Sequence, residues 1–293
     1  MTVTAQPRPR IPKGDPLFQA PSVAWPTLAL FVFAIALWAG AIVGHVAGVL
    51  PYWVTLPVQA VAVFISFTVL HDGVHRSLMR GHPRLNDRVA DLAGWLLTPL
   101  GSCAAFRVAH YAHHRNTNEP HDDPDMWSGV GPRWRLPLQW ATADLAYVPV
   151  LIRNWSAVKP RDRVAMLTPV IVLGGGYTLS WVLGWGVEAT LYWLLPSRLA
   201  VLWLAFAFNF LPHHPHDVRQ SLNPYAATNI REGGEPWMRW LFLYQNYHLI
   251  HHLFPSVPFY RYMRIWQRYG ADYRERGAPV VPVLGLVPRT GSS

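Results

Sequence analysis

The sequence has almost no cysteine, since Cys103 is the only one among its 293 residues. A lone thiol cannot form a disulfide within the chain. It also cannot supply the sets of thiolates that hold iron–sulfur clusters and many structural zinc ions. A metal or redox site in this chain must therefore draw on other side chains.

Charged residues are scarce as well, at 14% of the chain, whereas 51% of the residues are hydrophobic. None of the charged residues lies between Asp15 and Asp72. This uncharged run is long enough for two membrane spans of about 20 residues each. We expect these spans at residues 27–49 and 52–70, with a tight turn at Pro51 between them.

Two more uncharged runs predict a third and a fourth span. Residues 164–187 are long enough to cross a membrane alone. Residues 199–212 are too few, so the fourth span must extend back over 191–197, with Arg198 reaching toward an interface. The apolar stretch 92–106 is shorter than a span and has a charged residue at each end, so we expect an interfacial segment that does not cross.

These runs predict an all-α, polytopic membrane protein with four transmembrane helices, interfacial helices and a cytoplasmic, histidine-rich cap. Residues 1–26 are expected to be a cytoplasmic segment, 27–270 a single membrane domain and 271–293 a C-terminal tail. Lys and Arg are frequent in the N-terminal segment, in 76–163 and after Pro212, which predicts that the histidines and both termini face the cytoplasm. The charge of +9 is then a topology signal. Nucleic-acid binding is not expected, because no such motif is present.

Histidine is abundant, with 14 residues, most of them in groups at the predicted cytoplasmic ends of helices. Residues three and four apart share one face of a helix, so each group presents its rings in one direction. Nine imidazoles are more than one ion can use, which favours two metal ions, and imidazole suits zinc, copper, iron and nickel. The predicted metal ligands are His71, His75, His110, His113, His114, Asn209, His213, His248, His251 and His252.

Acidic and amide residues follow the middle group of histidines. Asp122, Asp125 and Asn118 are candidates for orienting the ligand rings through their free N–H groups. The acids could equally be turn residues around Pro124.

The three groups resemble the three histidine boxes of the integral-membrane fatty acid desaturase and hydroxylase superfamily. The motifs are His71-x3-His75, His110-x2-His113-His114 and His248-x2-His251-His252, and the resemblance extends over about 25–270. Asn209-x3-His213 resembles the additional site of acyl desaturases. The resemblance implies two iron ions that activate O2. Within the superfamily, 110–125, 210–216 and 246–262 look most like carotenoid ring hydroxylases and ketolases, to which Asn246 and Ile250 contribute.

We therefore expect an oxidoreductase of a bacterial inner membrane that hydroxylates a carotenoid ring, with acyl-lipid desaturation as the alternative. A non-enzymatic metal protein such as a zinc transporter, or a haem protein, is less expected because the histidines lie at helix ends rather than within the spans. The chain has no flavin or nicotinamide fingerprint. Electrons must come from a partner, such as a ferredoxin-like carrier with its reductase, which Arg231, Arg239, Arg264 and Arg268 could steer.

Overall fold

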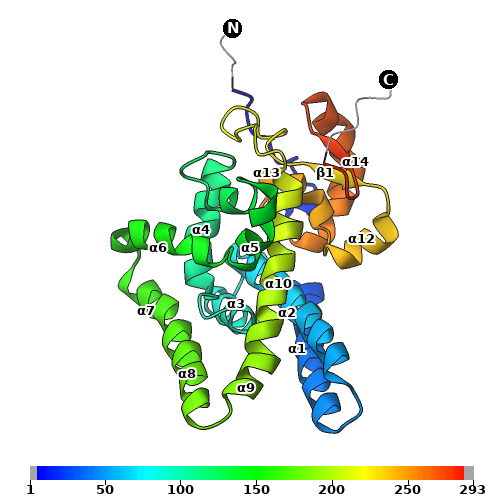
Figure 1. The fold of residues 1–293 in the computed structure, drawn as a ribbon. Coiled ribbons are helices and arrows are strands. Elements are labelled where there is room, and N and C mark those ends of the chain that lie inside the picture. The colour runs from blue at the N-terminus through cyan, green and yellow to red at the C-terminus, as the bar shows by residue number, and fades with distance from the viewer. Residues whose placement is uncertain (1–4, 287–293) are drawn as a thin grey trace. The chain divides into compact units, whose positions relative to one another are not determined.

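A computed structural model describes residues 5–286, and this part of the chain is almost entirely helical. Two short strands, β1 (Ile230–Glu232) and β2 (Val280–Pro282), pair in parallel and were not predicted. The helices, followed in Figure 1, are α1 (Trp25–Val46), α2 (Tyr52–Val74), α3 (Pro83–Leu97), α4 (Cys103–Asn116), α5 (Leu136–Ala141), α6 (Val148–Asn154), α7 (Pro160–Pro169), α8 (Gly175–Val182), α9 (Gly186–Ala189), α10 (Leu195–Leu204), α11 (Leu211–His213), α12 (Glu235–Leu241), α13 (His248–Leu253) and α14 (Tyr262–Glu275).

Four helical segments are long and apolar enough to cross a membrane, as predicted: Trp25–Val46, Tyr52–Val74, Pro160–Val182 and Gly186–His213. The third span begins and ends earlier than the expected 164–187. The fourth begins earlier than expected. Both are built from short α-helices joined by π-helical turns.

The predicted interfacial stretch 92–106 is interrupted between α3 and α4. Thr98 precedes Pro99 and is extended, with φ −166° and ψ 152°. A residue before proline is sterically disfavoured in the helical region, so α3 must end there. The break divides the apolar stretch into two short pieces, neither of which is among the four candidate spans of the described residues.

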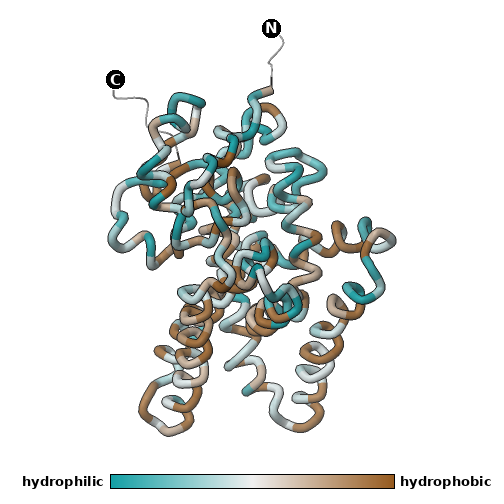
Figure 2. The backbone as a smooth tube through the Cα atoms, turned by 180° about the vertical axis from the view of Figure 1, so that it is seen from behind, coloured by the Kyte–Doolittle hydropathy of each residue, from teal (hydrophilic) through white to brown (hydrophobic). Residues whose placement is uncertain are grey.

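The chain forms two compact units, and each is described by itself. The membrane unit takes residues 21–109 and 141–203 and contains the hairpin of α1 and α2. Gly48 in their turn has a φ of +73°, which favours glycine. Large apolar side chains remain exposed along α1 and along the third span, and Figure 2 shows the hydrophobic colouring of these helices. Such surfaces suit contact with lipid.

Several polar side chains inside the membrane unit form hydrogen bonds or ion pairs with one another. The Thr27 hydroxyl donates to Asp72 at 2.9 Å. Both ends of the Arg198 guanidinium donate to Asp144 at 2.9 Å, and the reach of this side chain toward an interface stays a prediction. The Thr98 hydroxyl donates to the same carboxylate at 2.7 Å. The ion pair forms because a charge among apolar helices costs less when it has a partner.

The second unit, called the cap unit, takes its described residues from 1–20, 110–140 and 204–293. It contains α13, α14 and the two strands. Phe18 from the N-terminal segment packs edge-on against Phe254 after α13, with ring centroids 4.6 Å apart. This unit carries most of the grouped histidines.

Candidate metal centre

Seven of the predicted histidine ligands lie in the cap unit and are buried. They come from three helices. α4 carries His110, His113 and His114, α11 ends at His213, and α13 carries His248, His251 and His252. The turn before α11, Ala205–Phe210, is π-helical, and such turns are frequent at functional sites.

Four of these rings point their Nε2 atoms at one another. The Nε2 atom of His252 lies 3.2 Å from that of His113 and 3.1 Å from that of His248. The Nε2 atoms of His213 and His248 are also 3.1 Å apart. One ligand atom from each ring fits within 4.8 Å of all the others. We call His113, His213, His248 and His252 the four-histidine cluster.

A second set of rings meets beside the first. The Nε2 atom of His114 lies 3.1 Å from that of His110 and 2.8 Å from that of His251. The rings of His110 and His251 are stacked, with centroids 5.5 Å apart. These three residues form a second converging group within the cap unit.

Side chains behind the rings determine which nitrogen faces inward. The Nδ1–H of His248 donates to Gln245 Oε1 at 2.7 Å, and that of His252 donates to Gln220 Oε1 at 3.1 Å. The Nδ1 atom of His251 lies 3.1 Å from the Tyr262 hydroxyl. With Nδ1 protonated, the neutral imidazole keeps its lone pair on Nε2, which is the form that binds a metal.

Asp123 acts in the same way on His113. Its carboxylate accepts the Nδ1–H of His113 at 2.7 Å and the backbone N–H groups of Asn118 and Asp125 at 2.7 and 2.9 Å. Burial opposes a charge on this ring, but Asp123 and Asp125 outweigh it and raise the pKa of His113 to about 9. Burial and the surrounding rings lower the pKa of His252. Negative charge is therefore concentrated beside His113, whereas the His252 ring is neutral.

The donor set fits a metal ion. Lone pairs of His113, His248 and His252 face one another at 3.1–3.2 Å, and without a shared cation or proton they repel. An ion about 2.1 Å from each imidazole nitrogen would have neighbouring ligand atoms about 3.0–3.4 Å apart. The buried Nδ1 atom of His213 has no hydrogen-bond partner among the described residues. Either nitrogen of this ring is therefore free to bind a metal ion.

The remaining predicted residues lie in three places. His71 and His75, near the end of α2 in the membrane unit, have ring centroids 5.1 Å apart, as their spacing predicts. Asn209 is buried in the π-helical turn. Asp122 is exposed, and the closest carboxylate contact to His113 comes from Asp123 instead. The backbone N–H of Asn118 donates to the Asp123 carboxylate, and its side-chain amide donates to two backbone carbonyl groups.

Sequence reasoning missed several groups that orient the rings. Gln220 lies 32 residues before His252 and donates its amide N–H to the backbone carbonyl of His114 at 2.6 Å. Thr117 lies 3.4 Å from His252 Nδ1. Gln245 lies three residues before His248, so helical spacing could have identified it as a neighbour of that ring. Gln220 carries no local signal, because only folding brings it to the rings.

Asp123→Asn is expected to weaken metal binding or oxidation by about 10- to 100-fold, the usual cost of losing a carboxylate behind a ligand histidine. The amide cannot supply the negative charge that polarises His113. Metal content of the purified protein and the rate of product formation measure the effect. Asp122→Asn, in an exposed neighbour, is the matched control. Equal activity of both variants and the wild type would contradict the role given to Asp123.

Known proteins resemble this chain over most of its length. The family model described as fatty acid desaturase matches residues 47–283. A beta-carotene ketolase from a Paracoccus species is 31% identical, over 70% of this chain and 78% of the relative, and a second Paracoccus beta-carotene ketolase is 30% identical, over 68% and 72%. An sn-1 oleoyl-lipid 12-desaturase from a Picosynechococcus species is 26% identical, over 85% and 78%.

Proposed function

The chain belongs to the fatty acid desaturase family, and on this premise we propose that it uses O2 to hydroxylate a carotenoid ring in the membrane. It is an oxidoreductase with the four apolar helices of an integral membrane protein. The observation that carries the proposal is the convergence of buried histidine rings in the cap unit. The identity to beta-carotene ketolases supports a ring substrate.

We propose two iron ions as the cofactor. The four-histidine cluster would hold one ion, and His110, His114 and His251 would contribute to the other. His71, His75 and Asn209 are proposed as further ligands on the strength of their spacing. Iron bound there would supply the O2 activation that breaks an unactivated C–H bond.

The protein's own groups prepare the site for this chemistry. Asp123, Gln245 and Gln220 keep the Nδ1 proton on three rings, so that the Nε2 lone pairs stay available. The rings are almost completely buried. Burial keeps bulk water from the reacting atoms and limits wasteful release of reduced oxygen.

The membrane unit contains an apolar groove suited to a lipid molecule. Its outer part, of about 430 Å³, is lined by residues of α6, of the turn that follows it and of the third span, including Ile152, Trp155 and Val170. A narrow inner part is lined by Phe67, Phe106 and Tyr147, among others. Phe67 packs against His71, with ring centroids 5.8 Å apart. We propose that this groove receives the carotenoid or acyl chain; the parts share Leu100, Ala105 and Leu151.

Leu151→Trp is expected to obstruct the groove where its two parts join. Product formation should fall by about 10-fold or more, since one methylene of misfit in an apolar pocket already costs 1–3 kcal/mol. Initial rates in membranes, compared at equal metal content, measure the effect. Leu145→Trp makes the same substitution at a side chain that is 54% exposed and lines neither part of the groove, and its activity should stay close to wild type. Loss of activity in the control alone would contradict the proposed path.

Expression in a carotene-producing host tests the function. We expect hydroxylated carotenoid and an unchanged acyl-chain profile, both measured by mass spectrometry. Acyl-lipid desaturation is the second candidate, favoured by the likeness to the oleoyl-lipid desaturase. Unchanged carotene together with new double bonds in the lipids would overturn the first proposal in favour of the second. We further propose a bacterial inner membrane, with the histidines and both termini in the cytoplasm.

A further inference from the structure

The proposed hydroxylation needs electrons from outside the chain. It inserts one atom of O2 into a C–H bond and reduces the other atom to water, which consumes two electrons and two protons besides those of the substrate. A one-electron carrier must therefore reach the metal centre twice in each turnover. We propose that an acidic, ferredoxin-like carrier docks on the outer face of α14; this rests on the proposed function.

The inner face of α14 touches the metal centre. Tyr262 is fully buried in the first turn of the helix, and its hydroxyl lies 3.1 Å from Nδ1 of His251. Ile265, Trp266 and Tyr273 continue the same buried face at helical spacing. The whole helix, with its side chains, is about 10–12 Å across. A carrier on the opposite face would thus be separated from His251 by the thickness of one helix.

The outer face of α14 is basic. Arg264 and Arg268 are four residues apart, share this face and are exposed. The guanidinium of Arg268 lies 3.2 Å from Asp15, yet 61% of its side chain remains exposed. The acids of the helix, Asp272 and Glu275, lie toward its C-terminal end, and Asp272 accepts from Arg276 at 3.1 Å. The positive charge therefore dominates the part of the helix nearest Tyr262.

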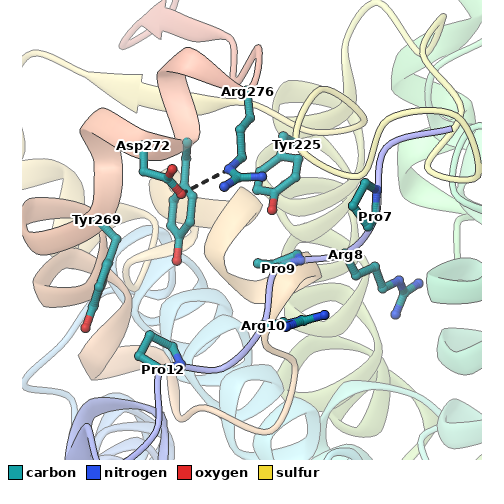
Figure 3. Close-up of a pocket in the computed structure, with 10 residues that line it drawn as sticks. Pro7, Arg8, Pro9, Arg10, Pro12, Tyr225, Tyr269, Asp272 and Arg276 are labelled. Atoms are coloured by element: carbon teal, nitrogen blue, oxygen red, sulfur yellow. Dashed lines mark hydrogen bonds and ion pairs between the residues drawn. The ribbon is translucent and has the colours of Figure 1, made fainter. Parts of the chain in front are cut away.

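A hollow of about 520 Å³ lies beside α14 and has further arginines in its lining. Figure 3 shows Arg8 and Arg10 from the N-terminal segment on one side, and Tyr269 and Asp272 of α14, with Arg276 just after the helix, on the other. Tyr269 is partly exposed and offers an amphipathic contact of the kind enriched at protein interfaces. We call Arg8, Arg10, Arg264 and Arg268 the basic surface. Such a surface attracts an acidic protein over a distance and raises its rate of association, in a manner that salt weakens.

Charge reversal of α14 tests this surface. In the full-length enzyme in membranes, the double variant Arg264→Glu with Arg268→Glu should raise the KM for a reduced, acidic ferredoxin by about 10-fold or more, since steering contributes 10- to 1000-fold to association. The dependence of wild-type turnover on salt should largely disappear in the variant. Arg133→Glu with Arg135→Glu reverses an exposed basic pair elsewhere in the cap unit and should leave the KM unchanged.

A single turnover driven by dithionite with a small neutral mediator bypasses the carrier. The α14 variant should match the wild type in this assay. An unchanged ferredoxin KM would overturn the proposal, and so would an equal loss in both assays, because the arginines would then act on the fold or the metal centre. If the wild type forms no product by either route, the proposed function itself has failed rather than the docking surface.

Discussion

His252→Ala is expected to abolish oxidation and to remove metal from the four-histidine cluster. His252 is 2% exposed, and its Nε2 atom lies 3.1–3.2 Å from those of two other rings. Loss of a group behind a ligand already costs 10- to 100-fold, so loss of the ligand itself should cost more than about 100-fold in product formation. Metal content, determined on the purified protein, should fall by about half, because the second group of rings is left intact.

His121→Ala is the matched control for this variant. His121 follows the middle group of histidines and is exposed, so its removal should change neither metal content nor rate. Full activity of His252→Ala would show that the four-histidine cluster does not hold the reactive metal. A variant with full metal content but no product would instead assign His252 to a role other than ligation.

Arg231→Met is expected to destabilise the cap unit by about 3 kcal/mol or more. The sequence suggested an exposed arginine that steers an acidic carrier, but Arg231 is 1% exposed. Its guanidinium donates to the carbonyls of Val283 and Gly285, at 3.1 and 2.9 Å, and to that of Leu211. Burial lowers its pKa to about 10. A buried carbonyl left without a donor costs about 1–3 kcal/mol, and four carbonyls lose a donor here, of which that of Leu211 is buried and those of Pro282, Val283 and Gly285 are partly buried.

This loss should also reach the metal centre. Leu211 lies in the same short helix as His213, so Arg231 connects the ligand-bearing segment to the segment after β2. Thermal unfolding in detergent, followed with and without metal, measures the effect. Arg219→Met is the control: its exposed ion pair with Glu119 is of a kind worth about 0–1 kcal/mol. Similar melting temperatures for both variants would contradict the structural role of Arg231.

The spans and the histidine groups were predictable because both depend on local spacing. In an uncharged run that crosses a membrane, the backbone N–H and C=O groups must find their hydrogen-bond partners within the same helix. The four spans are confirmed. Rings three and four residues apart on α4 and α13 face one direction for the same local reason. The four-span topology predicted that the groups on α4, α11 and α13 lie on one side of the membrane, and the resemblance of the three motifs added that they share one centre.

Contacts between distant segments were not predictable. Gln220 has ordinary turn chemistry in the sequence, and only the folded cap unit brings it to a ring nitrogen. Asn246, taken as a sign of a carotenoid substrate, is buried and donates to the backbone carbonyl of Arg231 at 3.3 Å. The strands β1 and β2 were missed because three residues are too short for a strand pattern to be recognised.

Product formation under isotopically labelled O2 tests the central claim most directly. Membranes that contain the protein, a carotene substrate and an electron-supplying system would be incubated with the labelled gas, and the carotenoid hydroxyl would be analysed by mass spectrometry. We predict that the hydroxyl oxygen carries the label and that His252→Ala yields no labelled product. A hydroxyl group without label, or carotene left unchanged while the acyl chains gain double bonds, would contradict the account.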